Sequence, residues 1–434
     1  MDIQSLYSKF LQHPAISTDT RKIISGSIFF ALKGEHFDGN TFALQALQQG
    51  AAYAVVSDRS LTDPRIVLVE DTLNALQVLA SHHRHQLNIP VLAITGSNGK
   101  TTTKELITIT LSKKYNVHAT AGNLNNHIGV PLTILSARKD TDILVCEMGA
   151  NHPGEIAFLC SIADPSHGII TNIGKAHLEG FGSLEGVRKA KGELFDYLQE
   201  HDGFAFVNAD DPNLRVIGDK VVNKLTYGLD TSYHPQVQFK YEAKEGQQGF
   251  TLNDANADFE INSSMFGYYN ATNLLAAYTV SRHFHVELKD IKDSLEGFVP
   301  GANRSEMVSY NGCLIVKDAY NANPSSMELA IKAFALQYPS GWIVLGDMKE
   351  LGDESQASHL QIIRQVLSFQ FSRIYLVGNA FSQAYQMSSG TDLRVTSADS
   401  IEAVKETWSW KECQGQTILL KGSRSMRLEL LLES

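Results

Sequence analysis

The sequence predicts an α/β protein of three domains, with a central P-loop-type parallel sheet flanked by two further α/β domains. Three observations lead to this expectation. Short apolar runs of strand length alternate with helical patterns along the whole chain, which favours mostly parallel sheets. Many of these runs end in polar or glycine residues, as strands do where a parallel sheet binds its ligand. With 434 residues, 43% of them hydrophobic, the chain is long enough to bury several cores.

The first domain is expected at residues 1–87, where the apolar run "GSIFFALKG" (26–34) predicts a strand. The polar stretch "SHHRHQLNIP" (81–90) then leads into the second domain. Its three histidines are compatible with a metal site, but the composition favours a solvated linker.

The central domain is expected at residues 88–300 and the third at 301–434, beginning near "VPGANRSEM". Five strands are expected in the central domain, at Val91–Thr95, Asp142–Met148, Gly168–Asn172, Phe204–Asn208 and Lys224–Tyr227. The third domain should contain strands within "CLIVKDAY", "WIVLGDM", "RIYLVGN" and "TILLKGS". Because ligands bind beyond the carboxyl ends of parallel strands, these ends are where functional side chains should lie.

The stretch after the first central strand, "TGSNGKTT", predicts a phosphate-binding loop. Gly96 and Gly99 allow a sharp turn that presents N–H groups to an anion, and the following helix points its positive end there. Lys100 would reach the β- and γ-phosphates, and the Thr101 hydroxyl would coordinate magnesium. A strict P-loop has glycine where this chain has Ile94, which indicates a variant loop and not an ordinary GTPase or kinase.

A lysine interrupts the apolar stripe of a predicted helix, "SLEGVRKAKGELFDYL", which should begin at the N-cap Ser183. Lys191 falls on the stripe that is formed by Leu184, Val187, Leu194, Phe195 and Leu198. A buried ammonium without a partner is costly, so we favour a side chain that extends to solvent. The alternative is a lowered pKa that lets Lys191 react with carbon dioxide to give a carbamate.

Two further residues follow predicted strands, Glu147 in "ILVCEMGAN" and His177 in "TNIGKAHLEGFG". Together with a carbamylated Lys191 they would form a second magnesium site. Taken singly, each also fits an ordinary role as a strand-end carboxylate, a surface histidine or a solvated lysine.

Composition narrows the function classes. The net charge of −10 and the absence of any Lys/Arg run beyond two residues argue against a nucleic-acid binder. An anionic substrate would therefore need a local positive site. The four cysteines form no C-x-x-C pair, so we expect reduced core residues and not a zinc site. The N-terminus shows no leader pattern and no apolar run approaches 18 residues, so we expect a cytoplasmic protein without membrane insertion.

Eight segments, which together span nearly the whole chain, resemble the Mur ligases, the ATP-dependent amide-forming enzymes of peptidoglycan precursor synthesis. They are "STDTRKIISGSIFFALKGEHFDGNTF" (17–42), "TGSNGKTTTKE" (95–105), "GNLNNHIGVPLTIL" (122–135), "EMGANHPGEI" (147–156), "AHLEGFGSLEGVRKAKGELF" (176–195), "DAYNANPSSM" (318–327), "VLGDMKELG" (344–352) and "LLKGSRSMRLE" (419–429). The loop of this family is T-G-x-x-G-K-T, which accommodates Ile94. "LGDMKELG" and "KGSRSMRLE" resemble the branch that adds D-alanyl-D-alanine.

The resemblance implies an N-terminal domain that binds a UDP-linked substrate, a central ATP-binding domain and a C-terminal Rossmann-like domain. It implies ATP-dependent joining of D-Ala-D-Ala to UDP-MurNAc-tripeptide through an acyl phosphate, by a monomer that uses ATP and two Mg²⁺ ions. It also implies that Lys191 is N6-carboxylated.

The resemblance assigns roles residue by residue. The catalytic residues would be Lys100, Lys191, His177 and Arg304. ATP would be bound by Gly96, Ser97, Asn98, Gly99, Lys100, Thr101, Thr102, Asn270, Asn273, Arg304 and Asp318. Metal ions would be held by Thr101, Glu147, His177 and Lys191. The uridine nucleotide would contact Thr20 and Arg21, and the muramoyl portion Asn123, Asn125 and Asn126.

Two features lie outside this assignment. Asp347 and Ser423, at strand ends of the third domain, are our candidates for binding D-Ala-D-Ala. The adenine-side pattern G-x-H-N-x-x-N is matched by "GYYNATN", in which Tyr269 stands where many members carry histidine. Three other functions are compatible with these motifs. The first is a related ligase, either a folylpolyglutamate synthase or the enzyme of another Mur step. The others are a catalytically silent nucleotide-binding protein or ATPase switch, and a P-loop kinase, which would give a phosphorylated product.

Overall fold

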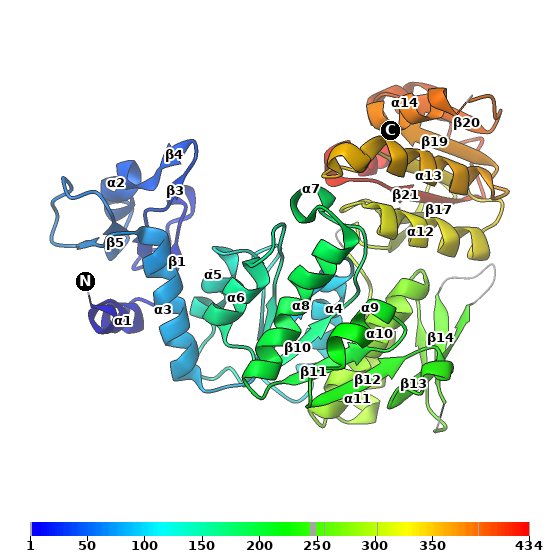
Figure 1. The fold of residues 1–434 in the computed structure, drawn as a ribbon. Coiled ribbons are helices and arrows are strands. Elements are labelled where there is room, and N and C mark those ends of the chain that lie inside the picture. Colours follow the sequence, from blue (N-terminus) through cyan, green and yellow to red (C-terminus); the bar gives the residue numbers. More distant parts are fainter. Residues whose placement is uncertain (1, 244–248, 256, 302, 389, 434) are drawn as a thin grey trace.

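The computed structural model describes residues 2–433 except 244–248, 256, 302 and 389. The described part contains three main sheets, which follow one another along the sequence (Figure 1). We call the parts of the chain built on them the N-terminal, central and C-terminal units. The central unit lies between the other two. The predicted α/β fold, with a largely parallel central sheet flanked by two further α/β units, is confirmed.

The N-terminal unit has a four-stranded parallel sheet in the order β1-β2-β5-β6. Its strands are β1 (Ile16–Ser17), β2 (Ile28–Phe30), β5 (Tyr53–Val56) and β6 (Ile66–Leu68), with a small hairpin of β3 (Lys33–Gly34) and β4 (Phe37–Asp38). Its helices are α1 (Ile3–Gln12), α2 (Ala43–Gln48) and α3 (Thr72–Leu87). The apolar run at 26–34 forms β2 as expected, because Ile28, Phe29 and Phe30 are fully buried.

The stretch at 81–90 is not a solvated linker, as its composition suggested. Most of it forms the last turns of α3, which packs against helices of the central unit. His83 and Arg84 are buried, and the Arg84 Nε donates to the carbonyl of Ala163 at 2.8 Å. Because the last carbonyls of a helix lack partners within it, they can accept from an arginine of a neighbouring helix, and these hydrogen bonds offset part of the cost of burying its charge.

The central unit has a nine-stranded sheet in the order β15-β14-β13-β12-β11-β10-β7-β9-β8, antiparallel only at β13–β15. Its strands are β7 (Val91–Thr95), β8 (Val117–Ala119), β9 (Ile143–Glu147), β10 (His167–Ile170), β11 (Phe204–Asn208), β12 (Lys224–Gly228), β13 (Val237–Ala243), β14 (Phe250–Asp254) and β15 (Glu260–Ser263). Its helices are α4 (Lys100–Leu111), α5 (Gly129–Ser136), α6 (Glu155–Ala163), α7 (Leu178–Phe181), α8 (Leu184–Glu200), α9 (Pro212–Gly218), α10 (Tyr268–His283) and α11 (Leu288–Glu296). The five expected strands are confirmed, with ends within two residues of the prediction.

Helices cover both faces of this sheet, and β7 shows how the sequence dictates it. Val91 and Ala93 belong to the core shared with α5, α6 and α8, whereas Leu92 and Ile94 belong to the core shared with α4 and α10. Successive side chains of a strand point to opposite faces, so a strand buried on both sides must be apolar throughout. The carboxyl end of β7 is thereby fixed between two layers of helices.

The C-terminal unit has a six-stranded sheet in the order β16-β17-β21-β18-β19-β20, with β16 antiparallel at the edge. Its strands are β16 (Glu306–Tyr310), β17 (Cys313–Asp318), β18 (Trp342–Gly346), β19 (Arg373–Val377), β20 (Val395–Ala398) and β21 (Thr417–Lys421). Its helices are α12 (Pro324–Gln337), α13 (Ser355–Leu367), α14 (Asn379–Met387) and α15 (Ile401–Thr407). The four strands expected here are confirmed.

Two expectations from composition can be compared with the described residues. All four cysteines are buried free thiols, as expected for core residues. A search of the described helices finds none with the length and apolarity that a membrane crossing requires.

Candidate active site

The phosphate loop leaves β7 at Thr95 and enters α4 at Lys100, as the sequence predicts. Gly96 has φ 141° and Gly99 has φ 79°, conformations that L side chains rarely adopt. A Cβ added at Gly96 would lie 2.0 Å from the Thr171 hydroxyl, and one at Gly99 would lie 2.6 Å from the Asn273 amide oxygen. Both glycines are therefore required by the backbone and by its neighbours.

The end of β10 holds the loop in place. The Ser97 N–H donates to the carbonyl of Asn172 at 3.0 Å, and the Asn98 N–H donates to the Asn172 side chain at 3.1 Å. The Thr171 hydroxyl donates to the Asn98 carbonyl at 2.5 Å. These contacts fix the loop before any ligand arrives, and such preorganisation lowers the cost of binding.

Lys100 is the first residue of α4, and its Nζ donates to the Gly96 carbonyl at 2.7 Å. Burial lowers the pKa of Lys100, Glu147 opposes this change, and the positive charge of Arg304 adds to it. The two cations come from different units of the chain, which indicates that their site is built to receive an anion.

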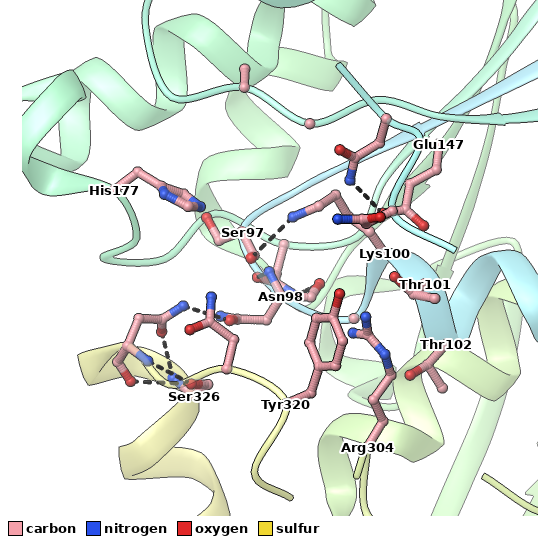
Figure 2. A pocket seen from close by; sticks show the side chains of 18 of the residues that line it. Ser97, Asn98, Lys100, Thr101, Thr102, Glu147, His177, Arg304, Tyr320 and Ser326 are labelled. Atoms are coloured by element: carbon pink, nitrogen blue, oxygen red, sulfur yellow. Dashed lines mark hydrogen bonds between the residues drawn. The ribbon is translucent and has the colours of Figure 1, made fainter. Parts of the chain in front are cut away.

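A cavity of about 500 Å³ lies between the central and C-terminal units, and the loop forms part of its wall (Figure 2). Most of the predicted site residues line it. They are Ser97, Asn98, Gly99, Lys100, Thr101, Thr102, Asn123, Asn125, Asn126, Glu147, His177, Asn270, Asn273, Arg304 and Asp318.

Glu147 ends β9 and is almost fully buried. Its Oε1 accepts a hydrogen bond from the Asn125 amide at 2.8 Å. Its Oε2 has no hydrogen-bond partner among the residues that the structure describes, and Lys104 Nζ lies 3.9 Å from it. A buried carboxylate oxygen left unsatisfied at a cavity wall fits a cation ligand. Within the described residues no group of three or more His, Cys, Asp or Glu side chains could hold a metal ion, so a cation here would also need other ligands, such as the Thr101 hydroxyl or phosphate oxygens.

Lys191 does not extend to solvent, so our favoured expectation from the sequence was wrong. Its side chain is 1% exposed, its Nζ donates to the Ala150 carbonyl at 3.1 Å, and it lies 5.2 Å from the centre of the Phe181 ring. Burial, together with the charge of Lys100, lowers the pKa of Lys191 to about 7. Since Ala150 lines the cavity, the amine lies directly behind its wall. A neutral amine in this place is compatible with the carbamate alternative.

His177 also lines the cavity, and Figure 2 shows it beside the loop near Ser97. Its Nδ1 lies 2.6 Å from a carboxylate oxygen of Glu350, which belongs to the C-terminal unit. Burial lowers the pKa of His177, and the charge of Glu350 opposes this change. Sequence analysis did not single out Glu350, although it lies within the segment "VLGDMKELG".

The C-terminal unit supplies Arg304 from the segment before β16. The guanidinium carbon of Arg304 lies 3.5 Å from the centre of the Tyr320 ring, and both side chains face the loop (Figure 2). The attraction between a guanidinium and the face of an aromatic ring holds the Arg304 side chain in place. Tyr320 lines the cavity but was missed, although it lies within the quoted "DAYNANPSSM".

Asp318 ends β17, and its carboxylate is engaged on two sides. One oxygen accepts from the Ser305 N–H at 3.1 Å, and the other forms an ion pair with Lys421 at 2.9 Å. The Tyr269 hydroxyl contacts the Ser305 hydroxyl at 2.9 Å, so the residue that replaces the family's histidine links α10 to the C-terminal unit. Sequence analysis missed Lys421, which lines the cavity at the end of β21.

Asn270 and Asn273 lie on α10 behind the loop. The Asn273 oxygen accepts from the Thr103 hydroxyl at 3.2 Å, and its amide donates to the Asn270 oxygen at 3.1 Å. The structure thus brings both predicted residues to the cavity, where they connect α10 to α4.

Six predicted site residues do not line the cavity: Thr20, Arg21, Gly96, Lys191, Asp347 and Ser423. Thr20 and Arg21 lie in the N-terminal unit, where Arg21 forms an ion pair with Asp19 at 2.8 Å. Asp347 accepts from the N–H of Phe381 at 2.9 Å, at the start of α14. The Ser423 hydroxyl accepts from the Lys349 N–H at 3.1 Å. The proposed substrate contacts of these residues stay predictions.

Comparison with known proteins decides the family. The model of the Mur ligase family catalytic domain matches residues 14–92, that of the Mur ligase middle domain residues 94–281, and that of the Mur ligase glutamate ligase domain residues 303–424. The UDP-N-acetylmuramoyl-tripeptide–D-alanyl-D-alanine ligase of Bacillus subtilis is 38% identical over 96% of this chain and 92% of its own length. The chain belongs to the Mur ligase family.

Other Mur ligases agree with this placement. The Escherichia coli protein of the same name is also 38% identical, over 96% of this chain and 92% of its own length. A crystal structure of MurF from Acinetobacter baumannii superposes with a TM-score of 0.86 at 31% identity, covering 96% of this chain and 92% of that one. MurF of Thermotoga maritima in complex with ADP superposes with a TM-score of 0.85 at 30% identity, covering 96% of each chain.

Proposed function

We propose that this Mur ligase joins D-Ala-D-Ala to UDP-MurNAc-tripeptide with the use of ATP, giving UDP-MurNAc-pentapeptide. The names of relatives that align over 96% of the chain support the substrates. The observation that carries the proposal is that Lys100 of the central unit and Arg304 of the C-terminal unit line the same cavity. Such a site can bring an anionic acid to an anionic phosphate.

ATP would bind with its phosphates on the loop at 96–102. The N–H groups at the start of α4 and the Lys100 ammonium suit phosphate oxygens. The MurF of Thermotoga maritima that was solved in complex with ADP superposes over 96% of this chain, which supports a nucleotide site. Asp318, with Asn270 and Asn273, would contact the nucleoside.

The reaction needs two anions to meet. A carboxylate acylates poorly, so its oxygen first attacks the γ-phosphorus of ATP, and ADP leaves as the acyl phosphate forms. The amine of the dipeptide then attacks the acyl carbon, and the tetrahedral intermediate expels phosphate while the nitrogen loses a proton. Two unit charges of like sign at 4 Å repel by about 4 kcal/mol at an effective dielectric of 20. Lys100 and Arg304 would offset this repulsion and stabilise the charge that develops during transfer.

The residues present also fit two Mg²⁺ ions, which when bound would polarise the phosphate oxygens. Thr101 and Glu147 would hold the first, and the unsatisfied Glu147 Oε2 supports this assignment. His177 and an N6-carboxylated Lys191 would hold the second with Glu147. Because Lys191 is buried with a pKa near 7, much of its amine is neutral at neutral pH and free to react with carbon dioxide.

The remaining assignments follow the same resemblance. Thr20 and Arg21 would contact the uridine nucleotide, and Asn123, Asn125 and Asn126 the muramoyl portion. Domains at 1–87, 88–300 and 301–434 are supported by family matches that change near 93 and between 281 and 303. We propose that the enzyme acts as a monomer.

The deciding experiment measures phosphate release with ATP, Mg²⁺ and UDP-MurNAc-tripeptide, with and without D-Ala-D-Ala, and identifies the product by mass. We expect release that depends on the dipeptide and a pentapeptide product. A panel of single amino acids, glutamate included, separates this activity from other Mur steps and from folylpolyglutamate synthesis. A phosphorylated product without an amide would contradict the proposal.

A further inference from the structure

The segment between β10 and α7 is held from the C-terminal unit at two points. The Lys175 N–H donates to the Ser325 hydroxyl at 2.8 Å, and the His177 Nδ1 lies 2.6 Å from Glu350 Oε2. Ser325 lies in the first turn of α12, and Glu350 in the loop that follows β18. Because the two sides belong to different units, both contacts depend on how these units are docked against each other.

The contact between His177 and Glu350 is built into the backbone on both sides. His177 has φ 51° and Glu350 has φ 61°, in the left-handed region that costs a non-glycine residue about 1 kcal/mol or more. Two residues beyond Glu350, a Cβ added at Gly352 would lie 3.7 Å from the Cβ of Glu179, so the two segments touch here as well. Strained residues persist where the surrounding packing determines their conformation.

Stability alone does not account for this pair. The Glu350 side chain is 57% exposed, and an exposed ion pair contributes only about 0–1 kcal/mol. Orientation is a better account. When a carboxylate accepts the proton of Nδ1, the other nitrogen, Nε2, keeps its lone pair and the ring is held in one plane. The only ring nitrogen of His177 left for a ligand in the cavity is then Nε2.

We propose that Glu350 is a positioning residue that orients His177 for cation binding. Because Glu350 belongs to the C-terminal unit, His177 is oriented in this way only when that unit is docked on the central unit. The inference rests on the proposed function, because it takes the ligand of His177 to be a divalent cation that accompanies ATP. The cation site of the central unit is thus completed by a residue that never touches the cation.

The test compares Glu350→Ala and Glu350→Gln with the unchanged protein, and uses Asp353→Asn as the matched control. Asp353 is an exposed carboxylate three residues further on in the same segment. The readout is Mn²⁺ binding, followed by electron paramagnetic resonance in the presence of a non-hydrolysable ATP analogue and UDP-MurNAc-tripeptide. This readout needs no turnover, so it tests the inference even if the dipeptide is not the acceptor.

We expect Glu350→Ala to weaken the binding of one Mn²⁺ ion by about 10- to 100-fold, the usual effect of removing a carboxylate behind a metal-bound histidine. Glu350→Gln should lose less, because its amide oxygen still accepts the Nδ1 proton. Asp353→Asn should bind Mn²⁺ as the unchanged protein does. With all substrates, kcat should fall in Glu350→Ala while the melting temperature stays the same.

Two results would overturn the inference. One is Mn²⁺ affinity within about twofold of the unchanged protein in Glu350→Ala, and the other is an equal loss in Asp353→Asn, which would indicate a general effect of charge. Failure of the proposed function looks different, because the unchanged protein would then bind Mn²⁺ with nucleotide but form no amide.

Discussion

Replacing Lys191 by methionine exchanges a buried amine for an apolar side chain of similar length, and the effect on stability should depend on pH. The pKa of Lys191 is lowered from 10.5 to about 7 by burial and by Lys100. Between these values the unfolded chain binds a proton that the folded protein lacks, so the stability of the parent rises with pH. Lys191 thus destabilises the fold most below pH 7, and this cost disappears as the pH approaches 10.5.

The pKa values set the magnitude. A fall from 10.5 to about 7 corresponds to about 5 kcal/mol against the folded protein at low pH. Between pH 7 and pH 9 the advantage of Lys191→Met over the parent should shrink by about 2 kcal/mol. The lost hydrogen bond to the Ala150 carbonyl subtracts about 1 kcal/mol at every pH, so it moves the curve without changing its slope.

The assay is urea denaturation of both proteins at several pH values, in buffers free of carbon dioxide so that no carbamate forms. Circular dichroism should be the signal, because all three tryptophans, Trp342, Trp408 and Trp410, lie in the C-terminal unit and would not report on α8. Comparing the two proteins at equal pH cancels the contribution of all other titrating groups to the free energy of unfolding. A difference that stays constant within about 0.5 kcal/mol from pH 7 to pH 9 would show that Lys191 titrates normally, and the carbamate assignment would lose its basis.

Three further substitutions test the cavity. Lys100→Ala should abolish turnover, measured as phosphate release, and near-normal activity would remove the phosphate role. Arg304→Ala should lower kcat by about 100-fold, whereas a change confined to ATP affinity would contradict its part in transfer. Gly96→Ala places a Cβ 2.0 Å from the Thr171 hydroxyl and should weaken nucleotide binding, measured by calorimetry, more than tenfold. Its control is Gly301→Ala, whose Cβ would meet no described atom within 4 Å.

The parts of the site that could be predicted from the sequence depend on local rules. A buried strand, a glycine turn and a helix start specify the phosphate loop. Glu147 was predicted because it follows a strand, and the carboxyl ends of parallel strands meet at the ligand site. The fold class followed in the same way, because a strand buried on both faces must be apolar throughout.

The predictions that failed concern residues whose surroundings are set by segments distant in the sequence. Arg84 and the histidines beside it looked solvated because the sequence cannot show that the carbonyl of Ala163 awaits the guanidinium. Lys191 looked able to extend to solvent because the helix pattern does not reveal that the Ala150 carbonyl and the Phe181 ring enclose its amine. Glu350 was missed because its partner lies in another unit, and no periodicity relates two units.

The charges of the cavity connect nucleotide binding to closure. Neither Lys100 nor Arg304 forms an ion pair with a carboxylate in the part of the chain that the structure describes. Burial lowers the pKa of Lys100, and the charge of Arg304 lowers it further. Closing an empty cavity therefore brings two cations together, whereas a triphosphate between them reverses the sign of the interaction. The polar contacts between the units, such as Asn323 to Asn98 at 2.7 Å, contribute only about 1 kcal/mol each. An anion that binds the closed form more tightly than the open form must stabilise closure by the same free energy, so ATP itself should assemble the site that uses it.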